Sequence, residues 1–174
     1  MTIEEVIIVI FRLVGAFPVL INPFWGALLV ILIDFSDLIL MNFISLGGVS
    51  NYQLLDKLLD FAYMITFLLV LFRFNNQAKR IGIILFSYRI TGMILYEIFH
   101  KRWVLFIFPN FFEFWIILIA LLRLKNNDTQ LNKKHIVFLL IPLMSIKLIQ
   151  EYILHVNKIL DNYTLIEFFD KFIF

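Results

Sequence analysis

Long apolar runs alternate with short polar interruptions along almost the whole chain. The interruptions contain Asn, Pro, Gly or small groups of charged residues, which are the residues that end helices. Residues 47–51 are the clearest loop signal. Most of the apolar runs approach the roughly 20 residues that a helix needs to cross a bilayer. The pattern predicts about six helices, at residues 2–20, 23–44, 52–74, 79–99, 109–124 and 135–156.

Local signals mark the beginnings of the first two helices. Thr2 and Glu5 have the spacing of a capping box, so the first helix is expected to begin at once. Asn22 is the expected N-cap of the second helix, with Pro23 at its first position. Arg12 lies inside the first helix and leaves two alternatives open: this helix spans the membrane, or it lies partly in the interface.

Composition indicates which solvent these helices face. Of the 174 residues, 62% are hydrophobic and 16% are charged, and the mean hydropathy is +0.94. A soluble domain carries about 25% charged residues, so lipid is expected to cover much of this surface. The sequence therefore predicts an all-α fold, a polytopic transmembrane helical bundle of about six helices. Residues 1–174 would form a single integral membrane domain in an inner, plasma or organellar membrane.

Partners and orientation follow from the same reading. Membrane lipids are the expected partners, together with other membrane subunits or a second copy of the chain, and a net charge of +2 gives no reason to expect nucleic acid.

One end of the predicted hairpins carries seven Lys and Arg residues and the other five, so the first end is predicted to be cytoplasmic. The seven are Arg73, Lys79, Arg80, Arg123, Lys125, Lys133 and Lys134. An aromatic belt at the interfaces is expected from Tyr52, Tyr63, Tyr96, Trp103 and Trp115.

Ionisable side chains inside the apolar runs are the candidate chemistry of this chain. A charge at membrane depth costs about 2.5–3.5 kcal/mol, so each calls for a functional or structural reason. In the predicted hairpin order, the set lies toward one membrane face. Its members are Asp34, Asp37, Asp56, Asp60, Glu97, His100 and Glu113. The first two aspartates are three residues apart and the next two are four apart, so each pair projects from one helix face. Because a short loop joins their helices, the four aspartates are predicted to share one pocket.

Carboxylates that lie so close together cannot all stay ionised unless a positive group neutralises them. Mg²⁺ or Mn²⁺ suits a set of oxygen ligands, and His100 would also admit zinc or iron. The alternative is neutralisation by basic side chains. Arg89, in the middle of the fourth helix, is then expected to pair with Asp60 or Asp34. The sequence leaves both alternatives open.

The two aspartate pairs resemble a known signature. Asp34-Phe-Ser-Asp37 followed by Asp56-Lys-Leu-Leu-Asp60 is similar to the D-x-x-D-G-x-x-A-R and G-x-x-x-D-x-x-x-D motifs of CDP-alcohol phosphatidyltransferases. Members of that family carry these motifs on their second and third helices. The resemblance implies that Asp34, Asp37 and Asp56 bind divalent ions, and that Asp60 acts as general base on the attacking alcohol.

This chain departs from the signature at several positions. Leu38 stands where the family has Gly, and Met41-Asn42 where it has Ala-Arg. Tyr52 stands where the family has the Gly that precedes the third aspartate. The missing Arg and Gly residues would be expected to help hold the nucleotide.

Two classes of function follow. In the first, the acids form the site of a divalent-cation-dependent lipid-modifying enzyme of the phosphotransferase kind, or of an ion- or proton-coupled carrier. The catalytic residue would then be Asp60, the metal ligands Asp34, Asp37, Asp56 and Asp60, and further site candidates Arg89, Glu97, His100 and Glu113. In the second, the chain is a small structural subunit of a larger membrane complex, and the acids pair helices. Whether the chain is an enzyme stays open.

Overall fold

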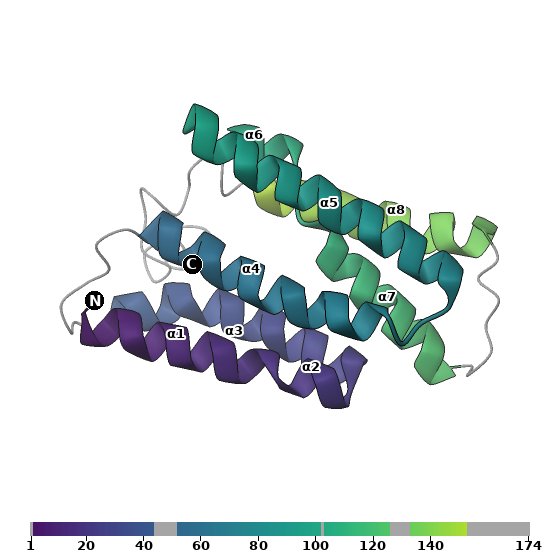
Figure 1. Ribbon diagram of the computed structural model, residues 1–174, viewed down its shortest axis with the longest axis horizontal. Helices are drawn as coiled ribbons and strands as arrows, with labels where there is room; N and C mark the ends of the chain where they lie inside the picture. The colour runs from purple at the N-terminus through teal and green to yellow at the C-terminus, as the bar shows by residue number, and fades with distance from the viewer. Residues whose placement is uncertain (1, 44–51, 102, 126–132, 153–174) are drawn as a thin grey trace, which may run out of the picture.

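The chain is all-α, with no strand in the part described by the computed structural model, which covers residues 2–43, 52–101, 103–125 and 133–152. The predicted loop at 47–51 lies outside these residues. The described residues form eight helices (Figure 1). They are α1 (Ile3–Ala16), α2 (Pro18–Ile21), α3 (Pro23–Phe43), α4 (Tyr52–Leu71), α5 (Asn76–Phe99), α6 (Trp103–Ile107), α7 (Phe111–Lys125) and α8 (Lys133–Glu151).

The first helices begin where their local signals predict. The hydroxyl of Thr2 accepts a hydrogen bond from the Glu5 backbone at 3.1 Å, and the Glu5 carboxylate accepts one from the Thr2 backbone at 3.0 Å. The predicted capping box is confirmed. The side chain of Asn22 accepts hydrogen bonds from two backbone N–H groups at the start of α3. The prediction of one helix over residues 2–20 is wrong, because it ends at Ala16 and α2 restarts at Pro18, which has no N–H to continue the ladder.

The later helices differ from the predicted bounds at their ends. α5 begins three residues earlier than expected because the side chain of Asn75 accepts a hydrogen bond from the Ala78 backbone at 2.8 Å and so caps it. At its other end, His100 adopts a left-handed conformation with φ 51° and terminates the helix. Two segments, Asn76–Phe99 and Trp103–Leu124, are long and apolar enough to cross a membrane.

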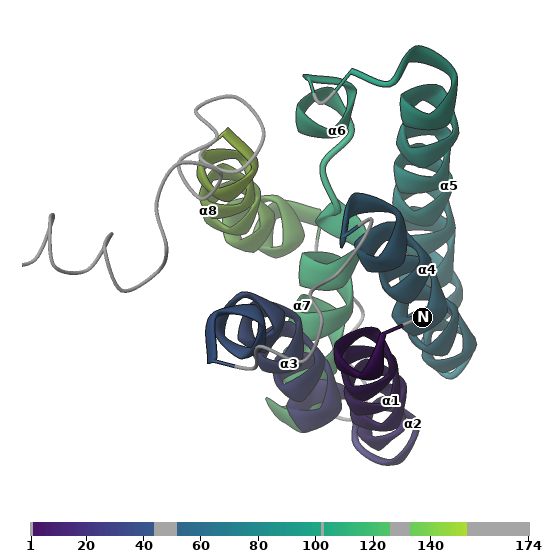
Figure 2. The ribbon, with the colours of Figure 1, turned by 90° about the vertical axis from the view of Figure 1, so that its left-hand side faces the viewer.

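α7 lies at the centre of the arrangement, in contact with α3, α4, α5 and α8 (Figures 1 and 2). Its buried side chains, among them Phe112, Trp115 and Ile116, form the core with Phe67 of α4. The indole of Trp115 donates to the backbone oxygen of Ala78 at 3.1 Å. Trp115 is therefore a core residue, and its predicted place in an interfacial belt is wrong.

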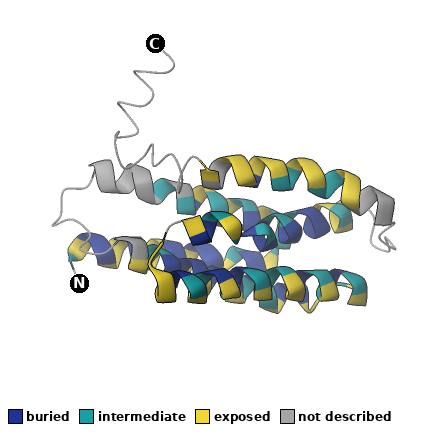
Figure 3. Ribbon diagram, turned by 90° about the horizontal axis from the view of Figure 1, so that it is seen from above, coloured by how far each residue is buried: buried dark blue, intermediate teal, exposed yellow. Residues whose placement is uncertain are grey.

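Exposed residues lie on the outer faces of the helices (Figure 3), and many of them are large and apolar. Examples on α1, α5 and α8 are Val14, Ile84, Ile98, Phe138 and Ile149. The apolar positions therefore serve two purposes: one set fills the core between helices, and the other faces outward.

Candidate functional site

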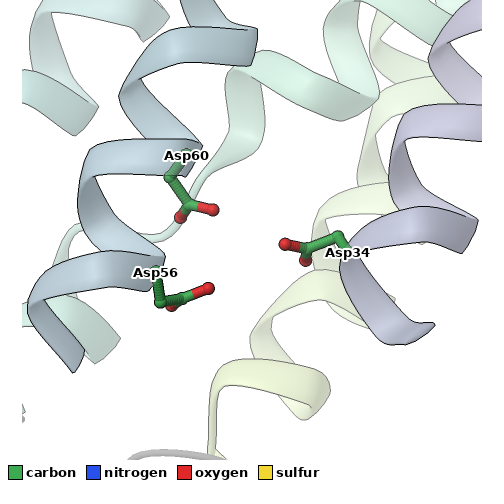
Figure 4. Close-up of side chains that lie close together, drawn as sticks. All are labelled: Asp34, Asp56 and Asp60. Atoms are coloured by element: carbon green, nitrogen blue, oxygen red, sulfur yellow. The ribbon is translucent and has the colours of Figure 1, made fainter. Parts of the chain in front are cut away.

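Asp34, Asp56 and Asp60 come together where α3 and α4 lie side by side (Figure 4). Asp56 and Asp60 are one turn apart on α4, and Asp34 faces them from α3. One carboxylate oxygen of each lies within 4.8 Å of the others. The side chain of Asp37, the fourth aspartate expected in this pocket, lies outside the described residues. The i, i+4 spacing on α4 and the α3–α4 contact are thus what bring these three acids together.

Arg12 of α1 is the centre of this cluster. Its Nη1 lies 2.9 Å from an oxygen of Asp56, and its Nη2 lies 3.0 Å from an oxygen of Asp60. The same Nη2 also contacts a carboxylate oxygen of Asp34. Arg12 is 5% exposed, because α1 packs against both α3 and α4 (Figure 2). One buried guanidinium therefore contacts all three carboxylates.

Arg12 was not among the partners predicted for these acids. A signal was present, because a lone arginine on an otherwise apolar helix needs acidic partners. The sequence does not show which acids these are, since α1 and α4 are far apart along the chain and their packing decides the pairing.

A second arginine, Arg89 of α5, completes the neutralisation of Asp60. Its Nη2 lies 3.3 Å from Asp60, and its Nη1 donates to the backbone oxygen of Phe108 at 3.0 Å. Asp60 therefore lies between two buried guanidiniums. The cluster is less enclosed on its other side, where the side chains of Asp34 and Asp56 are 29% and 35% exposed, against 11% for Asp60.

Glu113 belongs to a separate buried polar group. Its carboxylate accepts a hydrogen bond from the hydroxyl of Tyr63, and it lies 3.3 Å from the ammonium of Lys147 in α8. The side-chain amide of Asn110 donates to the same hydroxyl at 2.9 Å. All four residues are buried. Tyr63 is therefore part of the interior of the bundle, and its expected place in an interfacial belt is wrong.

Glu97 and His100 are not members of the aspartate cluster. The carboxylate of Glu97 contacts the ammonium of Lys57, which also lies 4.1 Å from the centroid of the Tyr96 ring. His100 is exposed and ends α5. Among the described residues, the group that could hold a metal ion consists of aspartates alone.

The three aspartates could hold a metal ion by their donor type and spacing. Carboxylate oxygens are the ligands that Mg²⁺ and Mn²⁺ prefer. In this arrangement, however, Arg12 contacts an oxygen of each of them. The guanidinium stands where a shared ion would bind, so Arg12 and a metal ion are alternatives at this position.

No protein-family model, no curated protein and no solved structure matches this chain. The resemblance to CDP-alcohol phosphatidyltransferases therefore rests on residues 34–60 alone and stays a prediction.

Proposed function

We propose that this chain is a polytopic integral membrane protein of about six spans, in which the acidic cluster joins helices. The proposal is supported by the two helices that are long and apolar enough to cross a membrane, and by the large apolar side chains exposed on the outer faces. α3, α4 and α8 have 21, 20 and 19 residues. At about 1.5 Å per residue, each approaches the roughly 30 Å thickness of a hydrocarbon core. Lipid or neighbouring spans would cover the outward apolar faces.

The contact of Arg12 with three carboxylates carries the functional part of the proposal. Acids at membrane depth are unfavourable unless a positive group neutralises them. Arg12 joins α1 to α3 and α4, and Arg89 joins α5 to α4. A cluster arranged in this way holds four helices together. We therefore infer a structural role, as a small subunit of a larger membrane complex whose other spans pack against the exposed apolar faces.

The same three aspartates support a second candidate. Their oxygens approach within 4.8 Å, and the side chains of Asp34 and Asp56 are about one-third exposed. A divalent-cation-dependent lipid-modifying enzyme, or an ion- or proton-coupled carrier, would use these carboxylates. Mg²⁺ or Mn²⁺ would neutralise the acids in place of Arg12, and Asp60 would be the candidate base.

Manganese binding separates the two candidates. The full chain, purified in detergent, is titrated with Mn²⁺, and the free ion is counted by electron paramagnetic resonance. In the structural role, the wild type binds no Mn²⁺ at the cluster because Arg12 neutralises the acids. Arg12→Gln should create a site for Mn²⁺, and a further Asp56→Asn should remove it. Arg80→Gln, which removes an exposed arginine from α5, is the matched control.

Stoichiometric binding of Mn²⁺ to the wild type, abolished by Asp34→Asn, would contradict the structural role and favour the cation-dependent one. This arm needs only the wild type and a conservative variant, so it decides the question even where Arg12→Gln fails to fold.

A further inference from the structure

A second polar feature lies at the other end of the bundle from the acidic cluster. The turn between α2 and α3, the end of α4 and the end of α7 lie at this end (Figure 1). Residues of these segments line an open cavity of about 340 Å³. Arg73 and Arg123 line it together with Asn22, Ile21, Phe24 and Leu124. The described lining thus combines two cationic side chains with apolar ones, and it contains no acid.

The two arginines are held in place by backbone oxygens. Nη1 of Arg73 donates to the backbone oxygen of Leu20, and Nη1 of Arg123 donates to the backbone oxygen of Arg73 at 3.3 Å. The guanidinium of Arg123 also lies 5.3 Å from the centroid of the Phe74 ring. A guanidinium has five N–H donors, so each keeps several for a ligand. Each guanidinium thus has one backbone partner and further donors that face the cavity or solvent.

These arginines differ from the two in the acidic cluster. Arg12 and Arg89 each contact carboxylates. Arg73 and Arg123 are exposed, and neither has a carboxylate partner within the part of the chain that the structure describes. Because both arginines line the same cavity, an anion bound there could accept hydrogen bonds from both guanidiniums. A phosphate group matches the planar fork of arginine well.

The apolar part of the lining points to a lipid as the source of that phosphate. Ile21 is 87% exposed and Leu124 is 57% exposed at the rim of the cavity. Trp25, directly after the lining residue Phe24, is also largely exposed, as tryptophans at a membrane interface are. This end of the bundle carries Lys79 and Arg80 as well, among the first five residues of α5. Basic residues at a membrane surface attract anionic lipids.

We propose that this cavity binds the phosphate of an anionic phospholipid headgroup, with Arg73 and Arg123 as its donors. The apolar rim then contacts the glycerol and the first carbons of the acyl chains. The site uses none of the residues of the acidic cluster. Its failure would leave the proposed role of Arg12 standing, and the reverse also holds.

Native mass spectrometry of the full chain in detergent tests this site. The probes are phosphatidylglycerol, phosphatidylcholine with the same acyl chains, and inorganic phosphate. The wild type should bind phosphatidylglycerol more tightly than phosphatidylcholine. The double variant Arg73→Gln/Arg123→Gln should bind it about tenfold more weakly or worse, the effect of losing a charge-assisted hydrogen bond. The matched control Lys79→Gln/Arg80→Gln removes the same charge from the same end outside the lining, and should keep its affinity.

Each result decides the proposal. Equal losses in the two double variants would mean diffuse attraction to a basic surface and would overturn it, as would a wild type that binds both lipids alike. Competition by inorganic phosphate supports phosphate as the recognised group. Inorganic phosphate that binds through Arg73 and Arg123, with no preference of the wild type for phosphatidylglycerol, would assign the site to free phosphate and refute the lipid. Where the glutamine variant does not fold, Arg73→Lys/Arg123→Lys keeps the charge but loses the planar fork, and should still weaken binding of phosphatidylglycerol.

Discussion

At the scale of single residues, Asp60 and Arg12 have the largest consequences. Asp60 accepts contacts from Arg12 and from Arg89, one on each of its two oxygens. Arg12 contacts two further acids with the same guanidinium. A planar group with five donors can contact several carboxylates at once, whereas the ammonium of a lysine is a single point of charge. The cluster therefore depends on arginine at this position.

The change Asp60→Asn tests this dependence. It keeps the shape of the side chain but leaves two buried guanidiniums with less negative charge, so we expect the free energy of unfolding to fall by about 3–5 kcal/mol. Thermal or denaturant unfolding in detergent measures the loss. The control is Arg80→Gln, which removes an exposed side chain from α5 and should change stability by about 0.5 kcal/mol or less. An Asp60→Asn variant as stable as the wild type would contradict the structural role.

At the scale of helices, the close crossing of α2 and α3 depends on one small residue. A Cβ atom added to Gly26 of α3 would lie 2.3 Å from the backbone nitrogen of Val19 in α2. Backbone atoms cannot turn away as side chains can. The break between α2 and α3 therefore folds back tightly only because position 26 has no side chain.

Gly26→Ala should therefore separate α2 from α3 and lower the free energy of unfolding by about 1–3 kcal/mol, the usual range for overpacking. Gly15→Ala is the matched control, since its added Cβ would meet only the side chain of Ile33, whose end can rotate. The two variants are compared by thermal unfolding in the same detergent. Equal losses of stability would show that the backbone contact at Gly26 costs no more than the side-chain contact at Gly15, and would contradict this explanation.

At the scale of the whole molecule, the proposed membrane topology places the two ends of α5 on opposite sides. Lys79 lies in the first turn of α5 and Lys101 lies just after its last residue. The native chain has no cysteine, so single cysteines can be introduced without background.

Lys79→Cys should react with a membrane-impermeant maleimide added from the cytoplasmic side, and Lys101→Cys from the other side. This orientation follows from the larger number of Lys and Arg residues at the end of the bundle that contains Lys79. Labelling of both cysteines from the same side would show that α5 does not span. Labelling on opposite sides in reversed order would overturn the orientation alone.

Helix formation in this chain was predictable because its causes are local. The capping box at Thr2 and the N-cap at Asn22 act over three residues or fewer, and the structure shows both. The apolar runs likewise predict where the helices lie. The two misses also concern local signals: Pro18 was placed inside the first helix, and Asn75 was placed in the break before the fourth helix rather than at its N-cap.

The partners of the charged residues depend on tertiary structure. Spacing on α8 favours Glu151 as the partner of Lys147, yet Lys147 lies 3.3 Å from Glu113 of α7, while the side chain of Glu151 is not among those described. Arg12 binds acids 44 and 48 residues further along the chain. Composition and periodicity determined that the chain is helical and apolar. Only helix packing decided that a buried arginine would stand among the aspartates, because the rotation of each helix about its axis sets which side chains meet.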